Sequence, residues 1–371
     1  MQKIKDLIRE ETVLFILLIL FILLTALIPG HISEYPGFID WKTIVTLLSL
    51  IILATGIKES GYIDKLANKM LDGIRDERTL AFFMTGLSAA LSTFLTNDIT
   101  LFIVVPLTVC MQKILRNDLA KLVIFEAIAV NAGSALTPIG NPQNIFLWHS
   151  WGISFGSFML KMALPVAVMA AALSVFIPAF FKPHKLHFHA GVETSGTRKT
   201  LGIISCCLMA VFLAALQFKY YAWMLPVIFL FYLVYEKKVL AKTDWLLILT
   251  FMLMFIDFAL IAKSGFISGL LNKISLSKAV NVYFSSAVIS QLISNVPAAI
   301  FMSKFSNSWQ AITYGVNIAG NGTIIGSLAN IIAIRLLKPK SPGIWLKFHK
   351  YSIPFFLITG GVVWGLMTIN N

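Results

Sequence analysis

Long apolar stretches follow one another along almost the whole chain, and they restrict what it can fold into. An apolar helix needs about 20 residues to cross the hydrocarbon core of a bilayer, and about nine stretches are long enough. The predicted spans are residues 12–28, 41–57, 120–149, 156–182, 200–216, 220–236, 244–262, 309–336 and 347–367. Because 58% of the residues are hydrophobic and only 13% are charged, the chain is predicted to be an all-α polytopic membrane protein.

The basic residues predict how the chain is oriented in the membrane. The formal net charge is +13, and most of the 30 lysines and arginines fall in alternate connecting segments. Because cytoplasmic loops carry an excess of these residues, the N-terminus and the 183–199 loop are predicted to be cytoplasmic and Asn371 outside, in the cell inner (plasma) membrane. The expected partners of this charge are membrane lipids, not nucleic acid. His187 and His189 are interpreted as solvated loop residues rather than metal ligands.

Four short stretches recur in the same order, which predicts an internal repeat. The matched stretches are Asp40-Trp41 with Asp244-Trp245, Ser60-Gly61 with Ser264-Gly265, 92–97 with 290–295, and 131–144 with 317–330. They predict a first repeat at 1–182, the cytoplasmic loop at 183–199 and a second repeat at 200–371. An odd number of predicted crossings separates the two Asp-Trp pairs. The second repeat would therefore be inverted relative to the first, as in many secondary transporters.

Two apolar segments carry polar residues in their middle and are short for two full crossings. The first, about 79–112, is interpreted as a re-entrant helical hairpin with Thr96-Asn97-Asp98 at its tip. Its counterpart, about 279–304, would have Ser294-Asn295-Val296 at its tip and Pro297 at the first position of the second arm, where a missing N–H is harmless. Two ordinary spans are the alternative for each pair of arms.

Two predicted spans, about 120–149 and 309–336, contain helix-breaking residues at membrane depth. In the first, Pro138 removes a backbone donor, and Asn141-Pro142 is a signal for a restarted half-helix. Non-helical backbone is tolerated at this depth only where it is buried in protein or lines a wet cavity, so each broken helix predicts a site. The matched polar residues that would support the site are Asn131, Thr137, Asn144, Asn317, Thr323 and Asn330.

The two tips and the two breaks supply the groups that a transport site needs. Half-helix N-termini carry unpaired N–H groups and partial positive charge, which suit an anion. Unpaired carbonyls, hydroxyls and amides suit Na⁺. The sequence therefore predicts a site for a small ion or anionic solute, with Na⁺ or H⁺ as coupling ion. It predicts no catalytic residue, no cofactor and no metal other than Na⁺.

The pattern TND…TPIGNPQN with SNVP…GTIIGSLAN resembles the ion-transporter superfamily of arsenite permeases, citrate transporters, NhaD-type sodium/proton antiporters and divalent anion/sodium symporters. Across nearly the whole chain the similarity is strongest to the small YbiR-type inner-membrane permeases. The resemblance implies a homodimeric secondary active transporter with a scaffold, a moving transport domain and elevator-type alternating access. An arsenite-type efflux permease and a Na⁺/H⁺ antiporter are the alternatives within the superfamily.

The same resemblance implies where ions and substrate bind. The first coupling-ion site would comprise Ser92, Thr96, Asn97 and Gly140, and the second Ser290, Ser294, Asn295 and Gly326. Substrate would contact Thr96, Asn97, Asn141, Ser294, Asn295 and Ser327. The divalent anion symporters have threonine as the third tip residue, whereas this chain has Asp98 and Val296, which argues against a dianionic substrate. Asp98 joins both sets because an ionisable residue inside the membrane is a functional candidate by default.

Several of these residues allow a second interpretation. Asp98 would also serve as the N-cap of the second hairpin arm. Glu126 and Asp257, which also lie within spans, are interpreted as structural, and Asn131 and Asn317 would equally form interhelical hydrogen bonds. An intramembrane protease using Asp98 and Asp257 as an aspartyl dyad is the enzyme alternative, although no Gly-x-Gly-Asp stretch surrounds either residue. A channel is the third alternative.

Overall fold

The structure is a computed structural model that describes residues 11–61, 69, 74–114, 119–186, 198–217, 220–265, 269, 274–337 and 343–369. Within these ranges the regular secondary structure is helical, apart from an isolated β-bridge between Asp76 and Lys185. The prediction of an all-α fold is therefore confirmed. His187 and His189 lie outside the described residues.

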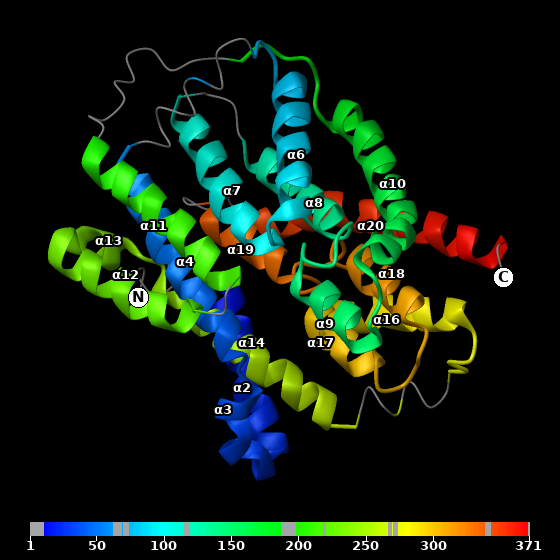
Figure 1. Cartoon of the computed structure of the whole chain (residues 1–371). Helices are drawn as coiled ribbons and strands as arrows, with labels where there is room; N and C mark the ends of the chain where they lie inside the picture. Colours follow the sequence, from blue (N-terminus) through cyan, green and yellow to red (C-terminus); the bar gives the residue numbers. More distant parts are fainter. Residues whose placement is uncertain are drawn as a thin grey trace. The chain divides into compact units, whose positions relative to one another are not determined.

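The helices follow one another in the colour order of Figure 1. Their bounds are α2 (Thr12–Leu27), the 3-10 helix η1 (Pro29–Glu34), α3 (Tyr35–Phe38), α4 (Trp41–Glu59), α6 (Glu77–Phe94), α7 (Asn97–Ile114), α8 (Ala120–Ser134), α9 (Pro142–Trp151), α10 (Phe155–Phe180), α11 (Lys199–Gln217), α12 (Tyr221–Tyr235), α13 (Lys237–Lys242), α14 (Trp245–Lys263), α16 (Ala279–Ile293), α17 (Asn295–Met302), α18 (Trp309–Ala319), α19 (Leu328–Leu336) and α20 (Ile344–Ile369). Each predicted span contains one of these helices, or two where a break was predicted.

Three helices in the described part of the chain, α4, α10 and α20, are long and apolar enough to cross a membrane. A further candidate is the pair Leu14–Leu27 and Pro29–Phe38, which is bent by 116°. Shorter apolar segments occur in α7, α11, α12, α14 and α16. These helices fit a helical membrane protein, and the number of nine full spans stays a prediction.

Contacts between residues divide the chain into two compact units. Unit 1 comprises Met1–Lys69 and Gly191–Ser264, and unit 2 comprises Met70–Ala190 and Gly265–Asn371. Each unit therefore combines one segment from each predicted repeat, and the corresponding parts of the two repeats belong to the same unit. The boundaries predicted for the repeats themselves stay predictions.

In unit 1, the repeated Asp-Trp pairs begin two helices, α4 and α14, with the same local structure. Each aspartate is the N-cap, and the indole of each tryptophan donates to a carbonyl oxygen five residues upstream. The matched hydrogen bonds run from the Thr43 N–H to Asp40, from the Leu247 N–H to Asp244, from the Trp41 indole to the Pro36 carbonyl and from the Trp245 indole to the Leu240 carbonyl. The recurring pair is thus a helix-start signal.

The repeated Ser-Gly pairs end the same two helices. Gly61 and Gly265 have φ angles of 74° and 75°, in the left-handed region that favours glycine after a helix. The hydroxyls of Ser60 and Ser264 donate to carbonyl oxygens three residues earlier, at 2.6 and 2.7 Å. Both helices have 19 residues, so the matched stretches specify the start and the end of equivalent helices.

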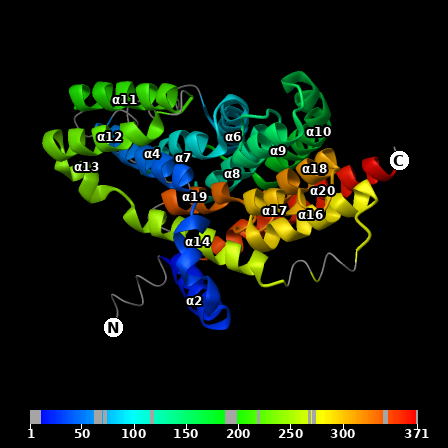
Figure 2. The same ribbon diagram turned by 60° about the horizontal axis from the view of Figure 1, so that its bottom comes forward.

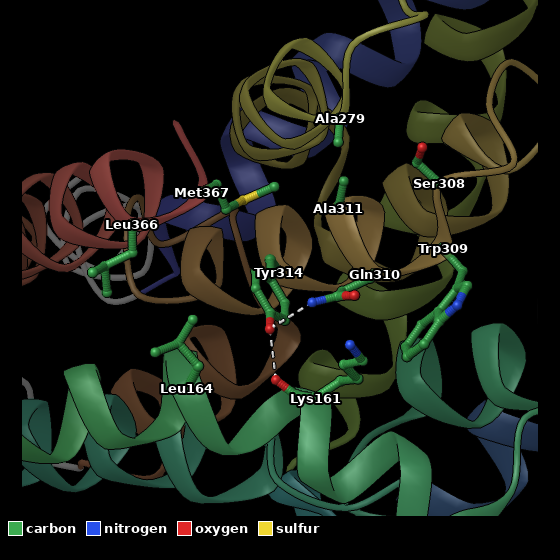
Figure 3. A pocket seen from close by; sticks show the side chains of 10 residues that line it. All are labelled: Lys161, Leu164, Ala279, Ser308, Trp309, Gln310, Ala311, Tyr314, Leu366 and Met367. Atoms are coloured by element: carbon green, nitrogen blue, oxygen red, sulfur yellow. Dashed lines mark hydrogen bonds between the residues drawn. The ribbon is translucent and has the colours of Figure 1, made fainter. Parts of the chain in front are cut away.

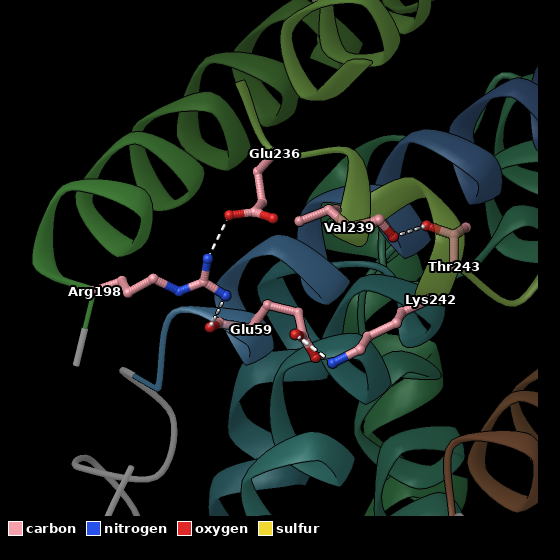
Figure 4. A network of polar contacts seen from close by, with 6 residues as sticks. All are labelled: Glu59, Arg198, Glu236, Val239, Lys242 and Thr243. Carbon is pink, nitrogen blue, oxygen red and sulfur yellow. Dashed lines mark hydrogen bonds and ion pairs between the residues drawn. The ribbon is translucent and has the colours of Figure 1, made fainter. Parts of the chain in front are cut away.

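An ionic network joins three segments of unit 1 (Figure 4). The Arg198 guanidinium pairs with Glu236 and donates to the Glu59 carbonyl oxygen at 3.3 Å, and the Lys242 ammonium pairs with the Glu59 carboxylate at 2.6 Å. Exposed pairs of this kind contribute little to stability. They do bring together the ends of α4, α11 and α13, all of which the charge pattern assigns to the cytoplasmic side.

The beginning of α6 and the end of α10 meet in unit 2. Asp76 is the N-cap of α6 and accepts a hydrogen bond from the Thr79 N–H at 3.0 Å, which lowers the pKa of Asp76. The stabilising effect of the cap is therefore present above the ordinary aspartate pKa and is lost as the pH falls through the lowered value. The Arg78 guanidinium donates to the Phe181 carbonyl oxygen at 2.9 Å. Both segments are predicted to be cytoplasmic.

Two helix pairs in unit 2 pack along each other: α6 on α8, and α16 on α18 (Figures 1 and 2). Each pair has a glycine at its closest approach. A Cβ at Gly133 of α8 would lie 2.1 Å from the Ala89 carbonyl oxygen, and one at Gly315 of α18 would lie 2.5 Å from the Tyr283 carbonyl oxygen. The backbones are therefore too close for any side chain at these positions, as at many interfaces between membrane helices.

Gly133→Ala is expected to destabilise unit 2, because the added methyl group would collide with the backbone of α6. Overpacking of this kind costs about 1–3 kcal/mol, and the midpoint of thermal unfolding in detergent should fall. Gly86→Ala is the matched control, because nothing lies within 4 Å of a Cβ at that position and alanine favours helix. Equal midpoints for the two variants would contradict the close approach of α6 and α8.

Candidate functional site

The first predicted hairpin is a helix–break–helix in the structure. Helix α6 ends at Phe94, Leu95 is extended, and α7 begins at Asn97. The Asn97 side chain accepts a hydrogen bond from the Asp98 N–H at 2.9 Å, and the Thr96 hydroxyl accepts one from the Ile99 N–H at 3.5 Å. The interpretation of Asp98 as the N-cap of the second arm is therefore wrong: Asp98 lies in the first turn, and the residues before it cap the helix.

The second predicted hairpin has the same form. Helix α16 ends at Ile293, and α17 begins at Asn295, whose side chain accepts from the Val296 N–H at 3.0 Å. Ser294 between them has a φ of 68°, a conformation that costs a residue other than glycine free energy. Pro297 is the third residue of α17, not the first as predicted. Its missing N–H is still harmless, because the first four N–H groups of a helix have no partner within it.

Each hairpin tip is bound to the helix break of its own repeat through the main chain. The Asn97 N–H donates to the Gly140 carbonyl oxygen at 2.9 Å, and the Asn295 N–H donates to the Gly326 carbonyl oxygen at 3.1 Å. The four residues are related by the sequence matches. A Cβ at Gly140 would lie 2.2 Å from the Ser134 carbonyl oxygen, so this break also requires glycine.

Both broken helices restart with side-chain caps. The first break separates α8, which ends at Ser134, from α9, which starts at Pro142, and Asn141 accepts from the Asn144 N–H at 2.9 Å. The second break separates α18 from α19, and Ser327 accepts from the Ala329 N–H at 3.3 Å. The restart at Asn141-Pro142 is where the sequence predicts it.

The carbonyl groups freed by the breaks are bound by two matched asparagines. Asn144 Nδ2 donates to the carbonyl oxygens of Ser134 and Thr137, and Asn330 Nδ2 donates to those of Gly320 and Thr323, at distances between 2.8 and 3.4 Å. Residues 134 and 320 correspond in the repeat, as do 137 and 323. The two breaks are thus closed by equivalent hydrogen bonds.

The same asparagines join the two predicted repeats. Asn131 Nδ2 donates to Asn330 Oδ1 at 2.8 Å, and Asn317 Nδ2 donates to Asn144 Oδ1 at 2.7 Å. Two further bonds are also a matched pair, from Asn141 Nδ2 to Asn317 Oδ1 at 2.9 Å and from Ser327 Oγ to Asn131 Oδ1 at 3.0 Å. All six residues are buried. Asn131 and Asn317 therefore make interhelical hydrogen bonds in addition to lying at the site.

Two residues of this network were not predicted as site residues. Gln291 Nε2 donates to the Ala319 carbonyl oxygen at 2.8 Å, and its Oε1 accepts from the Thr323 N–H at 2.7 Å. The matching Thr93 accepts from the Thr137 hydroxyl through its carbonyl oxygen at 2.7 Å. The signal was present in the sequence, because 93 and 291 are matched positions within the repeated hairpin arms.

Helix α20 makes hydrogen bonds to the backbone of the second break. No sequence pattern predicted these contacts. His349 Nε2 accepts from the Ile324 N–H at 3.3 Å, while Nδ1 faces the Trp345 carbonyl oxygen at 2.9 Å. The Ser352 hydroxyl donates to the Gly322 carbonyl oxygen at 2.7 Å. These contacts fix the imidazole as the neutral form with its proton on Nδ1.

Some polar groups at the tips have no hydrogen-bond partner among the described residues. These are Asp98 Oδ1 and the Ser290 hydroxyl, both buried. Ser92 donates to the Ala89 carbonyl oxygen at 3.0 Å, and Asn295 Nδ2 reaches Ser327 Oγ at 3.4 Å. Within the described chain no hydrogen bond joins the two tips directly. The unpartnered groups are therefore the ones available to an ion or a substrate.

The other intramembrane acids lie elsewhere. Glu126 of α8 is buried and accepts a hydrogen bond from the Thr108 hydroxyl of α7, so it ties the second hairpin arm to the broken helix. Asp257 of α14 is buried with both carboxyl oxygens unpartnered among the described residues, and it belongs to unit 1. All the predicted site residues belong to unit 2. The described residues contain no cluster of three or more His, Cys, Asp or Glu that would hold a metal ion.

Comparison with known proteins identifies the class. A family model described as "Citrate transporter" matches residues 6–308. "Inner membrane protein YbiR" of Escherichia coli (strain K12) is 40% identical over 93% of this chain and 92% of its own length. "Uncharacterized transporter MJ0456" of Methanocaldococcus jannaschii is 30% identical over 96% of this chain and 95% of its own length.

A third relative, "46 kDa membrane protein" of Mycobacterium leprae, is 23% identical over 85% of this chain and 82% of its own length. Together with the apolar helices, these similarities define a helical membrane transporter. The chain belongs to the citrate transporter family. The resemblance to YbiR-type permeases drawn from the tip and break motifs is confirmed.

Asn317→Ala is expected to lower the stability of unit 2, because it removes the partner of Asn144 and Asn141 in a buried site. Each buried polar group left without a partner costs about 1–3 kcal/mol, so the midpoint of thermal unfolding in detergent should fall clearly. Asn307→Ala is the control, since Asn307 is exposed. If both variants unfold at the wild-type temperature, the buried asparagine network does not hold the two broken helices together.

Proposed function

We propose that the protein is a secondary active transporter that moves a small ion or anionic solute across the inner membrane, coupled to Na⁺ or H⁺. The observation that supports this most strongly is the matched attachment of each hairpin tip to a helix break, Asn97 to Gly140 and Asn295 to Gly326. Such an arrangement directs half-helix N-termini and free polar groups at one buried place. Membership of the citrate transporter family supports the same function.

The substrate would be held by Thr96, Asn97, Asn141, Ser294, Asn295 and Ser327, with Asp98 beside them. Amides, hydroxyls and helix N-termini bind an anion without carrying a full charge themselves. The family description names citrate. A carboxylate at position 98 would repel a trianion of that kind unless it carries a proton or holds a cation, so a smaller or less charged anion fits this chain better.

The coupling ion would bind beside the substrate. The proposed first site uses Ser92, Thr96, Asn97 and Gly140, and the second uses Ser290, Ser294, Asn295 and Gly326. Hydroxyl, amide and carbonyl oxygens are suitable ligands for Na⁺. The position that matches Asp98 in the second repeat is Val296, which cannot carry a charge. We propose that Asp98 binds the coupling proton, or a coupling Na⁺ that competes with that proton.

The transport cycle would be of the elevator type. In this proposal unit 1 is the scaffold, which forms a homodimer, and unit 2 is the moving domain, because unit 2 contains all the proposed binding residues. The re-entrant hairpins, the nine spans, a cytoplasmic N-terminus and an outside C-terminus belong to the same proposal. Arsenite-type efflux and Na⁺/H⁺ antiport are the alternative activities within this fold.

Asn97→Ala and Asn295→Ala are each expected to reduce the initial rate of gradient-driven uptake into proteoliposomes by more than about tenfold, which corresponds to 1.4 kcal/mol of barrier. Each variant removes a side chain at one of two equivalent tips of a single site. Asn307→Ala should transport at the wild-type rate. Normal uptake by both tip variants would show that the tips are not part of the binding site. The thermal unfolding midpoint of the same samples distinguishes loss of the binding site from loss of the fold.

Asp98→Asn is expected to separate binding from coupling, since it keeps the shape of the side chain but removes its proton exchange and charge. Solute counterflow, which needs no gradient, should persist, whereas gradient-driven accumulation and its pH dependence should be lost. Both are measured on the same proteoliposomes. Unaltered accumulation in this variant would show that Asp98 takes no part in coupling.

A further inference from the structure

A pocket lies in unit 2 at the meeting point of four helix ends (Figure 3). It has a volume of about 560 Å³ and is lined by the beginnings of α10, α16 and α18 and by the end of α20. All four helix ends fall in segments that the charge pattern assigns to the outer side of the membrane. None of the tip or break residues lines this pocket, so it is separate from the proposed transport site.

One wall of the pocket is polar and held in place by hydrogen bonds. The Tyr314 hydroxyl donates to the Lys161 carbonyl oxygen at 2.6 Å and accepts from Gln310 Nε2 at 2.9 Å (Figure 3). Trp309 closes this wall, with its ring stacked on Phe158 at a centroid distance of 5.9 Å. The polar groups of the lining that remain for a ligand are the Lys161 ammonium, the Ser308 hydroxyl and the second N–H of Gln310 Nε2.

The charge of the lining residues has one sign. Lys161 is the cation among them, they include no aspartate or glutamate, and Lys161 forms no ion pair with the described residues. Lys161 is seven residues after the N-cap Ser154 of α10, about 10 Å along the helix axis. In the predicted orientation Lys161 lies near the outer end of α10, and a lysine near the end of a membrane helix extends its ammonium towards the headgroups.

Another part of the lining is apolar. It consists of Leu164, Leu366, Met367 and Ala279, from helices whose outer surfaces also expose Leu160 and Trp364. Exposed apolar surface of this kind faces lipid in a membrane helix. A soluble polyanion would leave this wall without a partner and would meet a single cation, whereas an amphiphile with one negative charge matches both walls.

We propose that this pocket binds the headgroup of an anionic phospholipid from the outer leaflet. The Lys161 ammonium pairs with the lipid phosphate, and the Gln310 amide bonds to the headgroup or ester oxygens. Trp309 and Tyr314 lie at the level of the glycerol backbone, as aromatic residues do at membrane interfaces. The first methylene groups of the acyl chains lie against Leu164 and Leu366.

Fluorescence quenching by lipids brominated on their acyl chains tests this proposal. Purified full-length protein in detergent is titrated with brominated phosphatidylglycerol or brominated phosphatidylcholine, and the Trp309 signal is the difference between wild type and Trp309→Phe. A single lysine near the headgroups contributes about 1 kcal/mol, so half-maximal quenching is expected at about five-fold lower phosphatidylglycerol than phosphatidylcholine. Half-maximal quenching at equal concentrations of the two lipids would overturn the proposal.

Three lysine variants and a comparison of two salts provide the controls. Lys161→Gln should abolish the preference for phosphatidylglycerol, Lys161→Arg should keep it, and Lys304→Gln should keep it because Lys304 is exposed but does not line the pocket. Retention of the preference in Lys161→Gln would contradict the proposal, and so would its loss in Lys304→Gln. Displacement of the lipid by inorganic phosphate, beyond that by sodium chloride of equal ionic strength, would assign the pocket to a free anion instead.

Discussion

The main-chain groups released at the two helix breaks are the constraint on which unit 2 depends. Inside a bilayer no water satisfies a free N–H or C=O, so a broken helix is stable only where the protein itself supplies partners. Asn144 and Asn330 supply them by binding the carbonyl groups of their own breaks, and each also accepts a hydrogen bond from Asn317 or Asn131 of the other repeat. Each of these asparagines therefore makes hydrogen bonds at both breaks, so each broken helix stabilises the non-helical backbone of the other.

Because most polar groups at the tips and breaks are hydrogen-bonded within the protein, only a few remain to bind an ion or a substrate. At the hairpin tips, the N–H groups of Asn97 and Asn295 donate to the carbonyl oxygens of Gly140 and Gly326 at the breaks. These hydrogen bonds fix the position of each tip relative to its break. Oδ1 of Asp98 and the hydroxyl of Ser290 stay buried without partners among the described residues. A site that is rigid in its backbone and unsatisfied in a few side chains is suited to binding a small polar solute with an ion, because little ordering remains to be done on binding.

The features that the sequence predicted are those with local causes. Asn141-Pro142 restarts a helix, and Asp40 and Asp244 start equivalent helices, because capping acts within three residues of chain. The sequence also predicted that the two tips and the two breaks contribute to one site. The pairing of asparagines across the repeats and the hold of His349 on the second break depend on which helices pack together. Such contacts leave no local pattern. The predicted starts of α7 and α17 were two residues too late, which misplaced the cap role of Asp98 and the position of Pro297.

The buried polar site of unit 2 is proposed to carry a solute across the membrane, driven by an ion gradient. Uptake of a panel of small anions, citrate included, into liposomes that contain the wild-type protein tests it most directly, with Na⁺ and H⁺ gradients imposed separately and then collapsed by an ionophore. At least one anion is expected to accumulate above its outside concentration under one of the gradients and to leave again when that gradient is collapsed. Flux that only equalises the two sides, whatever gradient is imposed, would contradict the account and indicate a channel.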